Sequence, residues 1–247
     1  ARKKQGDSTD SLSLPGRVQP ELPAGLPEAE RAWRRQLAQT REDHAAKLYL
    51  LSRRVLTTGF PSVAYQIVRE VAQVDPDHVV ARRLLGFVRQ GDEWVTPFAA
   101  KMIRARNVWH DKYGWLPVEH VARYENGERY YKGRWIPADK ESALRQDFRN
   151  AWEIRTENYL VKTNVSLERG VEIAAKLEEF HDYFLQMFAA YFNSPEQLEK
   201  LFRAGGDSSH TRARRKQYVV HYYRTRDEYV ERLRAKIPMI DITNGLY

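Results

Sequence analysis

The sequence contains no cysteine among its 247 residues. This absence excludes disulfide frameworks, thiolate zinc sites, iron–sulfur clusters and cysteine nucleophiles together, although it does not identify a cellular compartment. No apolar run approaches the roughly 18 residues that a transmembrane helix needs, and the first residues do not have the pattern of a signal peptide. The sequence therefore predicts no membrane span.

Motifs that carry catalysis or hold cofactors are also lacking. The seven histidines include no pair four residues apart, so there is no His-Glu-x-x-His zinc motif. Gly205-Gly206 lacks the lysine of a phosphate-binding loop. Glu178 and His181 form one Glu-x-x-His pair on an expected helix, but a metal site needs more ligands, and a solvated helix face is the simpler interpretation. We therefore predict no catalytic residue, no metal ligand and no cofactor within these 247 residues.

Positive charge is present in excess. Lys and Arg total 41 against 33 Asp and Glu, which gives a formal net charge of +8. Most of this excess lies in residues 29–90, where arginines alternate with apolar residues in a helical pattern. A helical surface of this kind either contacts a partner or is arginine-rich for solubility, and the sequence leaves both interpretations open. The arginines concerned are Arg31, Arg34, Arg35, Arg41, Arg53 and Arg54.

Composition and periodicity predict an α+β fold with four segments. Residues 1–28 are rich in Pro, Gly and Ser without periodicity, which is typical of a disordered leader. Residues 29–90 predict a helical hairpin module, and residues 91–150 predict short strand and helix repeats built on Trp and Pro. Residues 151–247 predict an α/β segment, with one long helix from Ser166 to about Phe192 on a small sheet and a short second helix that starts at Pro195.

Part of the helical module resembles a tetratricopeptide repeat. The resemblance lies in the run Asp75-Pro76-Asp77-His78-Val79-Val80-Ala81, followed by Leu85-Gly86. A solenoid needs at least about three such repeats to be stable, and one and a half are visible. We therefore expect a small helical module, not a superhelix.

Tryptophans recur at regular intervals through the second segment. Trp94, Trp115 and Trp135 each follow a turn glycine and precede a proline suited to the first turn of a helix. We interpret them, together with Trp152, as structural aromatic anchors, because aromatic side chains dominate small cores by their buried area. Stacking on sugars or bases is the alternative. Asn126-Gly127 predicts a two-residue hairpin turn within the same segment.

The C-terminal third resembles the opening of peptidase-MA-like domains, which are zinc metallopeptidases of the gluzincin type. The resemblance rests on the strand Tyr159–Asn164, a long helix with Phe180 and Phe184, the strand Val219–Tyr223 and the run Arg226–Tyr229 that follows it. Further upstream, Gly127–Trp135 looks like the N-terminal region of bacterial proteins that carry such a domain. The likeness covers about residues 75–247.

This resemblance implies an envelope or periplasmic location in a bacterium, but it carries over no catalytic residue. The family holds zinc with a His-Glu-x-x-His helix, and that motif is absent here. One hypothesis is a non-catalytic scaffold or protein-interaction segment that joins a larger assembly. The alternative is the N-terminal part of an active zinc metallopeptidase, whose zinc would belong to a catalytic half beyond this chain.

A basic cluster in the C-terminal third offers a different function. A polyanion, an acidic protein or a nucleic acid could bind it through charge, although direct nucleic-acid recognition needs a known module or aromatic residues beside the charge. A solvated loop before a strand is the alternative. The candidate anion-binding or partner-binding residues are Arg203, Arg212, Arg214, Arg215 and Lys216.

Overall fold

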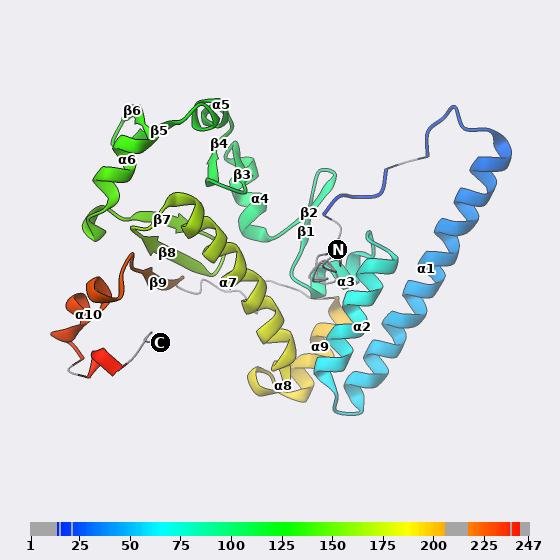
Figure 1. Cartoon of the computed structure of the whole chain (residues 1–247). Helices are drawn as coiled ribbons and strands as arrows, with labels where there is room; N and C mark the ends of the chain where they lie inside the picture. Colours follow the sequence, from blue (N-terminus) through cyan, green and yellow to red (C-terminus); the bar gives the residue numbers. More distant parts are fainter. Residues whose placement is uncertain (1–13, 15, 21, 206–216, 238, 243–247) are drawn as a thin grey trace, which may run out of the picture. The chain divides into compact units, whose positions relative to one another are not determined.

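The computed structural model describes residues 14, 16–20, 22–205, 217–237 and 239–242. Helices are mixed with short strands (Figure 1), so the predicted α+β class is confirmed. The chain divides into two compact units, and both are discontinuous in sequence. Unit 1 comprises the described residues within Ala1–Ala100 and Tyr183–Ala213, and unit 2 those within Lys101–Asp182 and Arg214–Tyr247.

Unit 1 is built mainly from helices. α1 and α2 lie side by side (Figure 1), and Ala189 and Phe202 from the C-terminal third fill the same core as Val68 and Leu84. None of the described helices is both long and apolar enough to cross a membrane. The elements of this unit are α1 (Glu28–Thr57), α2 (Pro61–Val74), α3 (Val79–Leu84), β1 (Val88–Gln90), β2 (Glu93–Val95), α8 (Ala189–Phe192) and α9 (Pro195–Ala204).

Local sequence explains where α9 begins and ends. Ser194 and Gln197 form a reciprocal capping box at its start, and Pro195 occupies the first turn, where a missing N–H costs nothing. Gly205 ends the helix in the left-handed conformation, with φ of 65°. The predicted start of a helix at Pro195 is therefore confirmed, and the defined ends orient Phe202 towards the core.

The predicted segment 151–247 does not form one module. α8 and α9 interrupt it and pack in unit 1 against α2 and α1. The predicted long helix also ends early, because α7 (Leu167–Met187) stops before Phe188, where the backbone leaves the helical conformation. Tertiary packing with residues more than 100 positions away decides this arrangement, and such contacts have no local sequence signal.

The described part of the predicted leader makes defined contacts with unit 1. Leu14 packs against the core of unit 1. The N–H of Trp94 donates to the Gly16 carbonyl at 2.7 Å, and the N–H of Val18 donates to Asp92 at 2.9 Å. Main-chain hydrogen bonds to β2 thus order this part of the leader, and they need no periodic pattern of side chains. Residues 1–13 lie outside the described part.

Unit 2 contains two further hairpins, each followed by a short helical turn. The β5–β6 hairpin turns at Lys132-Gly133, where both residues have positive φ, as a tight two-residue turn requires. The prediction of a hairpin turn at Asn126-Gly127 is wrong. These residues end the helix α5, and the Gly127 N–H donates back to the Tyr124 carbonyl. These elements are β3 (Asn107–His110), β4 (Gly114–Pro117), η1 (Val118–His120), α5 (Val121–Glu125), β5 (Glu128–Tyr131), β6 (Arg134–Pro137) and α6 (Ala138–Arg145).

A three-stranded sheet completes unit 2, in the order β7-β8-β9. β7 and β8 are antiparallel, whereas β8 and β9 are parallel, so their connection must be a long crossover. Ile154 and Val161 of the sheet pack against Val171 and Ala174 of α7. The division between the units falls within α4 and within α7. The remaining elements are α4 (Pro97–Arg104), η2 (Phe148–Asn150), β7 (Trp152–Arg155), β8 (Tyr159–Thr163), β9 (Tyr218–Tyr222), α10 (Arg226–Arg234) and η3 (Ile240–Ile242).

Candidate partner-binding site

The predicted basic cluster is described in part. Arg212, Arg214, Arg215 and Lys216 lie outside the described residues. Arg203 lies in the last turn of α9 and pairs with Glu199 one turn earlier, at 3.2 Å between Nη2 and Oε2. Whether Arg203 can bind a partner therefore depends on the side chains around it in unit 1.

Those neighbours are two arginines of the first helical module. Arg53 and Arg54, in the last turns of α1, line one hollow of unit 1 together with Arg203. Its volume is about 450 Å³, which is within the range of small-ligand sites. The complete lining is Leu50, Arg53, Arg54, Leu56, Thr57, Glu199, Phe202 and Arg203.

The floor and rim of this hollow differ in chemistry. Phe202 and Leu56 are buried beneath it, while Leu50 is 57% exposed at its edge. The lining contains three arginines and one acidic residue, Glu199. Guanidinium groups bind carboxylates through paired, charge-assisted hydrogen bonds. The hollow can therefore bind a group that carries carboxylates beside an apolar side chain.

A half-buried phenol joins α1 to α9. The hydroxyl of Tyr49 donates to the main-chain carbonyl of Phe202. Burial raises the pKa of Tyr49, while the charge of Arg53 opposes that shift. Tyr49 therefore stays protonated as a donor, and it holds the two arginine-bearing helices together.

Trp94 is a buried anchor of unit 1. Its indole Nε1–H donates to Asp77 Oδ1 at 2.8 Å, and it is 5% exposed. The fully buried Arg82 lies 5.8 Å from its ring and donates to the Pro76 carbonyl at 2.7 Å. Burial lowers the pKa of Arg82, and the charges of Asp77 and Asp75 act in the opposite direction. The ring is thus enclosed by protein and cannot stack on a ligand.

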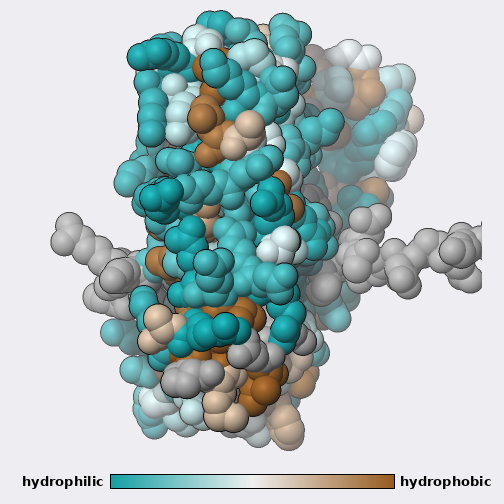
Figure 2. Space-filling view, turned by 60° about the vertical axis from the view of Figure 1, so that its left-hand side comes forward, coloured by the Kyte–Doolittle hydropathy of each residue, from teal (hydrophilic) through white to brown (hydrophobic). Residues whose placement is uncertain are grey.

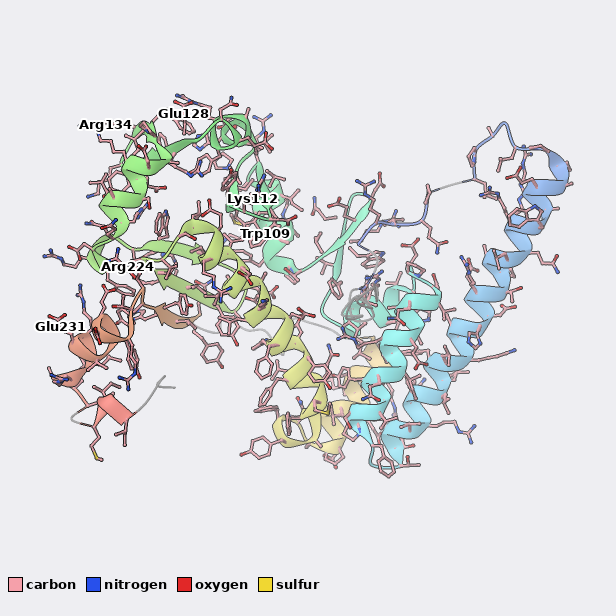
Figure 3. The ribbon with its side chains drawn as sticks, viewed as in Figure 1. Trp109, Lys112, Glu128, Arg134, Arg224 and Glu231 are labelled. Carbon is pink, nitrogen blue, oxygen red and sulfur yellow. The ribbon has the colours of Figure 1, made fainter. Side chains whose placement is uncertain are left out.

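Trp135 belongs to an aromatic cluster of unit 2. His120, Tyr130 and Tyr124 have ring centroids 4.7, 5.2 and 6.1 Å from it. The guanidinium of Arg123 stacks 3.9 Å from its ring centroid and is paired with Glu128 at 2.7 Å. Glu128 and Arg134, labelled in Figure 3, lie at opposite ends of the hairpin. Protein side chains therefore occupy the surface that sugar or base stacking would need.

The other two tryptophans are also packed within unit 2. Trp115 is half-buried and meets Trp109 edge to face, with ring centroids 5.7 Å apart. Trp152 is 6% exposed in β7, with the guanidinium of Arg145 5.9 Å from its ring. Its indole nitrogen has no hydrogen-bond partner among the described residues.

Glu178 and His181 do not converge on a metal. The Glu178 carboxylate accepts hydrogen bonds from the main-chain and side-chain N–H groups of Asn158, both at 2.6 Å. His181 instead packs edge to face on Tyr159 at 5.9 Å. Within the described ranges, no group of three or more histidine and acidic side chains has a metal-binding arrangement.

The sequence interpretation missed one surface of unit 1. Phe184, Phe188 and Tyr191 lie within the predicted long helix, and in the structure they are 36%, 49% and 84% exposed. Most of the face that Figure 2 shows is of the opposite kind, because teal, hydrophilic residues predominate there. The signal that could have revealed this surface is the absence of charge from residues 183–195.

Comparison with known proteins does not supply an assignment for either surface. No family model matches the sequence, and no curated protein or solved structure shows significant similarity to it.

Proposed function

We propose that this chain is a non-catalytic scaffold segment of a peptidase-MA-like protein and that it binds an acidic, partly apolar segment of a partner protein. The observation that carries the proposal is the hollow of unit 1, where Arg53, Arg54 and Arg203 surround a floor of Leu56 and Phe202. The likeness of residues 75–86 to a tetratricopeptide repeat supports the same role, because such helical modules bind peptides.

The position of the arginines favours a protein ligand. Arg53 and Arg54 are adjacent on a 30-residue helix, and Arg203 comes from a helix capped at both ends. Rigid helical supports hold binding side chains with little loss of conformational entropy on binding. The apolar floor adds affinity for a side chain such as leucine. The phosphate backbone of a nucleic acid has no apolar group that could fill it.

A peptide titration tests this site. The probe is a fluorescein-labelled peptide of alternating leucine and glutamate, compared with the same peptide carrying glutamine. The triple variant Arg53→Ala, Arg54→Ala, Arg203→Ala should bind the acidic peptide at least about 10-fold more weakly, because charge-assisted hydrogen bonds are lost. Fluorescence anisotropy on the full chain gives the dissociation constants.

The matched control removes the same charge from another part of unit 1. Arg34→Ala, Arg35→Ala, Arg41→Ala lies on the exposed first half of α1. Equal weakening by both triple variants would show non-specific attraction and contradict the proposed site. Stoichiometric zinc, or turnover of peptide substrates by these 247 residues, would contradict the non-catalytic role.

A further inference from the structure

Unit 1 exposes a second surface that the arginine hollow does not include. We call it the aromatic end surface. Phe184, Phe188 and Phe192 form a continuous row, with ring centroids 4.7 Å apart for the first pair and 5.9 Å apart for Phe184 and Phe192. Tyr191 lies against Phe192 at 5.2 Å. The exposed members are Tyr183, Phe184, Met187, Phe188, Tyr191 and Phe192.

This surface arises where two unusual stretches of sequence meet. Residues 55–68 and 183–195 are the two longest stretches without Lys, Arg, Asp or Glu in a chain that is 30% charged. α2 contacts α8, and Ala64 and Val68 share a core with Ala189. Each stretch therefore contributes buried side chains to that core and leaves the rest of its apolar side chains exposed.

The exposed area is large enough for a stable protein interface. The five aromatic members are on average about half exposed, so each offers roughly 100 Å² of the 150–250 Å² that an aromatic side chain can bury. Together they offer roughly 500 Å², within the range of the largest patch on an ordinary monomer. Two such surfaces facing each other would bury roughly 1,000 Å², about the least area that a specific interface needs.

We infer that the aromatic end surface binds a second copy of this chain and forms a two-fold dimer. In such a dimer the same patch faces itself. A patch with charges of one sign would then oppose its own copy, whereas a charge-free patch meets itself without repulsion. The overall charge of +8 lies elsewhere on the chain, so it favours solubility without opposing this contact.

Sedimentation equilibrium of the full chain over a range of concentrations tests the inference. The wild type should approach twice its mass of 29.0 kDa. Tyr191→Glu and Phe188→Glu should each raise the dimer dissociation constant at least about 30-fold, as for a central aromatic hot spot. Both side chains are about half exposed or more, so the fold should tolerate the change, and circular dichroism verifies this.

The matched control is Trp33→Glu, which places the same charge on an aromatic residue of α1 that is 52% exposed. Trp33 lies roughly 35 Å along the helix from Thr57, at 1.5 Å per residue, so its variant should dimerise as the wild type does. A wild type that stays monomeric at the highest soluble concentration would overturn the inference. Equal dimerisation of the Tyr191 variant would also overturn it.

A lipid surface is the competing occupant. A monomeric wild type that co-sediments with vesicles of phosphatidylcholine and phosphatidylserine would assign the aromatic end surface to membranes, and so overturn the dimer. Binding of the leucine–glutamate peptide should be unchanged in Tyr191→Glu, because that side chain does not line the arginine hollow. Failure of the dimer is thus distinguishable from failure of the proposed function.

Discussion

Arg82 of unit 1 and Arg123 of unit 2 have opposite surroundings. Unit 1 has one large apolar core and encloses Arg82 completely, with the pKa of its guanidinium lowered by burial. Unit 2 has a smaller core beside its sheet. It places Arg123 on the outer surface, where the side chain stacks on Trp135 and remains 44% exposed. Arg82 therefore depends on fixed internal partners, whereas Arg123 shares its interactions with water.

This difference predicts how each unit responds to substitution. A buried cation whose partners are removed leaves uncompensated charge or unmade hydrogen bonds, which is strongly destabilising. An exposed ion pair is screened by water and contributes little. We therefore expect large, localised effects in unit 1 and smaller effects at the surface of unit 2.

The largest expected effect is that of Arg82→Ala. The substitution leaves the carbonyl of Pro76 without its donor and removes the charge that faces Asp75 and Asp77. We expect a loss of about 3–5 kcal/mol in the free energy of unfolding, as for other broken buried pairs. Urea unfolding measures the loss, and hydrogen exchange should place it in unit 1.

The neighbouring Arg83 provides the control for this prediction, because its side chain is exposed on the same helix. Arg83→Ala should change stability by less than about 0.5 kcal/mol. Similar losses for the two substitutions would mean that burial of Arg82 adds nothing to stability. The contrast between enclosed and exposed arginine would then not hold.

The next effect is a loss of stability in alkali that originates in unit 1. Burial raises the pKa of Tyr65 to about 12 from its ordinary 10.0. Below pH 10 this tyrosine is neutral in both states. Between pH 10 and 12 the unfolded chain releases the proton and the folded chain keeps it, so stability falls as pH rises. A difference of two pKa units limits the loss to about 2–3 kcal/mol.

Urea unfolding at pH 9 and pH 11 measures this dependence, with Tyr65→Phe as the matched variant. The phenylalanine keeps the edge-to-face contact with Phe202, at 5.2 Å between ring centroids, but cannot ionise. The wild type should lose more stability over this interval than Tyr65→Phe does. An identical loss would assign the alkaline sensitivity to other groups.

Gly170→Ala in unit 2 should cause a loss of stability similar in size to the alkaline loss at Tyr65. Its cause is steric. A Cβ atom at this position would lie 2.5 Å from Ile154 Cδ1 and 2.8 Å from Thr163 Cγ2. The terminal methyl of Ile154 can move, but Thr163 is fully buried in β8. Overpacking of this kind costs about 1–3 kcal/mol. Gly25→Ala, with open space around the new Cβ, is the control in the same urea experiment.

The smallest effect should come from the surface stack of unit 2. Arg123→Ala removes the cation above Trp135 and the pair with Glu128. Both interactions are exposed to solvent, so we expect only a small loss in the free energy of unfolding, together with a change in tryptophan fluorescence. A loss as large as that of Arg82→Ala would contradict the distinction between enclosed and solvent-shared arginine.

Local signals account for what the sequence predicted correctly. The start of α9 follows from Ser194 and Pro195, and the glycine–tryptophan–proline units mark the second strand of each hairpin and the helical turn after it. Each of these depends on neighbours within a few residues. The α+β class followed from the same short-range patterns.

Contacts between distant residues account for what the sequence did not predict. Phe202 fills a core with Tyr65, and the leader pairs with β2 through main-chain atoms that have no side-chain signature. Asn126-Gly127 has the composition of a hairpin turn but serves as a helix end, because α5 directly precedes it. Contacts between distant residues also bring Arg203 into the same hollow as Arg53 and Arg54. From the sequence alone, Arg203 belongs to the basic cluster and the other two arginines to the helical module.

The discontinuity of unit 1 has a consequence during protein synthesis. The ribosome produces α1, α2 and α3 more than 100 residues before Phe202, which completes their core. At about 5–20 residues per second, these helices wait roughly 5–25 seconds for α9. During that interval the apolar faces of α1 and α2 are uncovered in the nascent chain. Synonymous codon changes that slow translation between residues 101 and 182 should therefore increase aggregation, although they leave every amino acid unchanged.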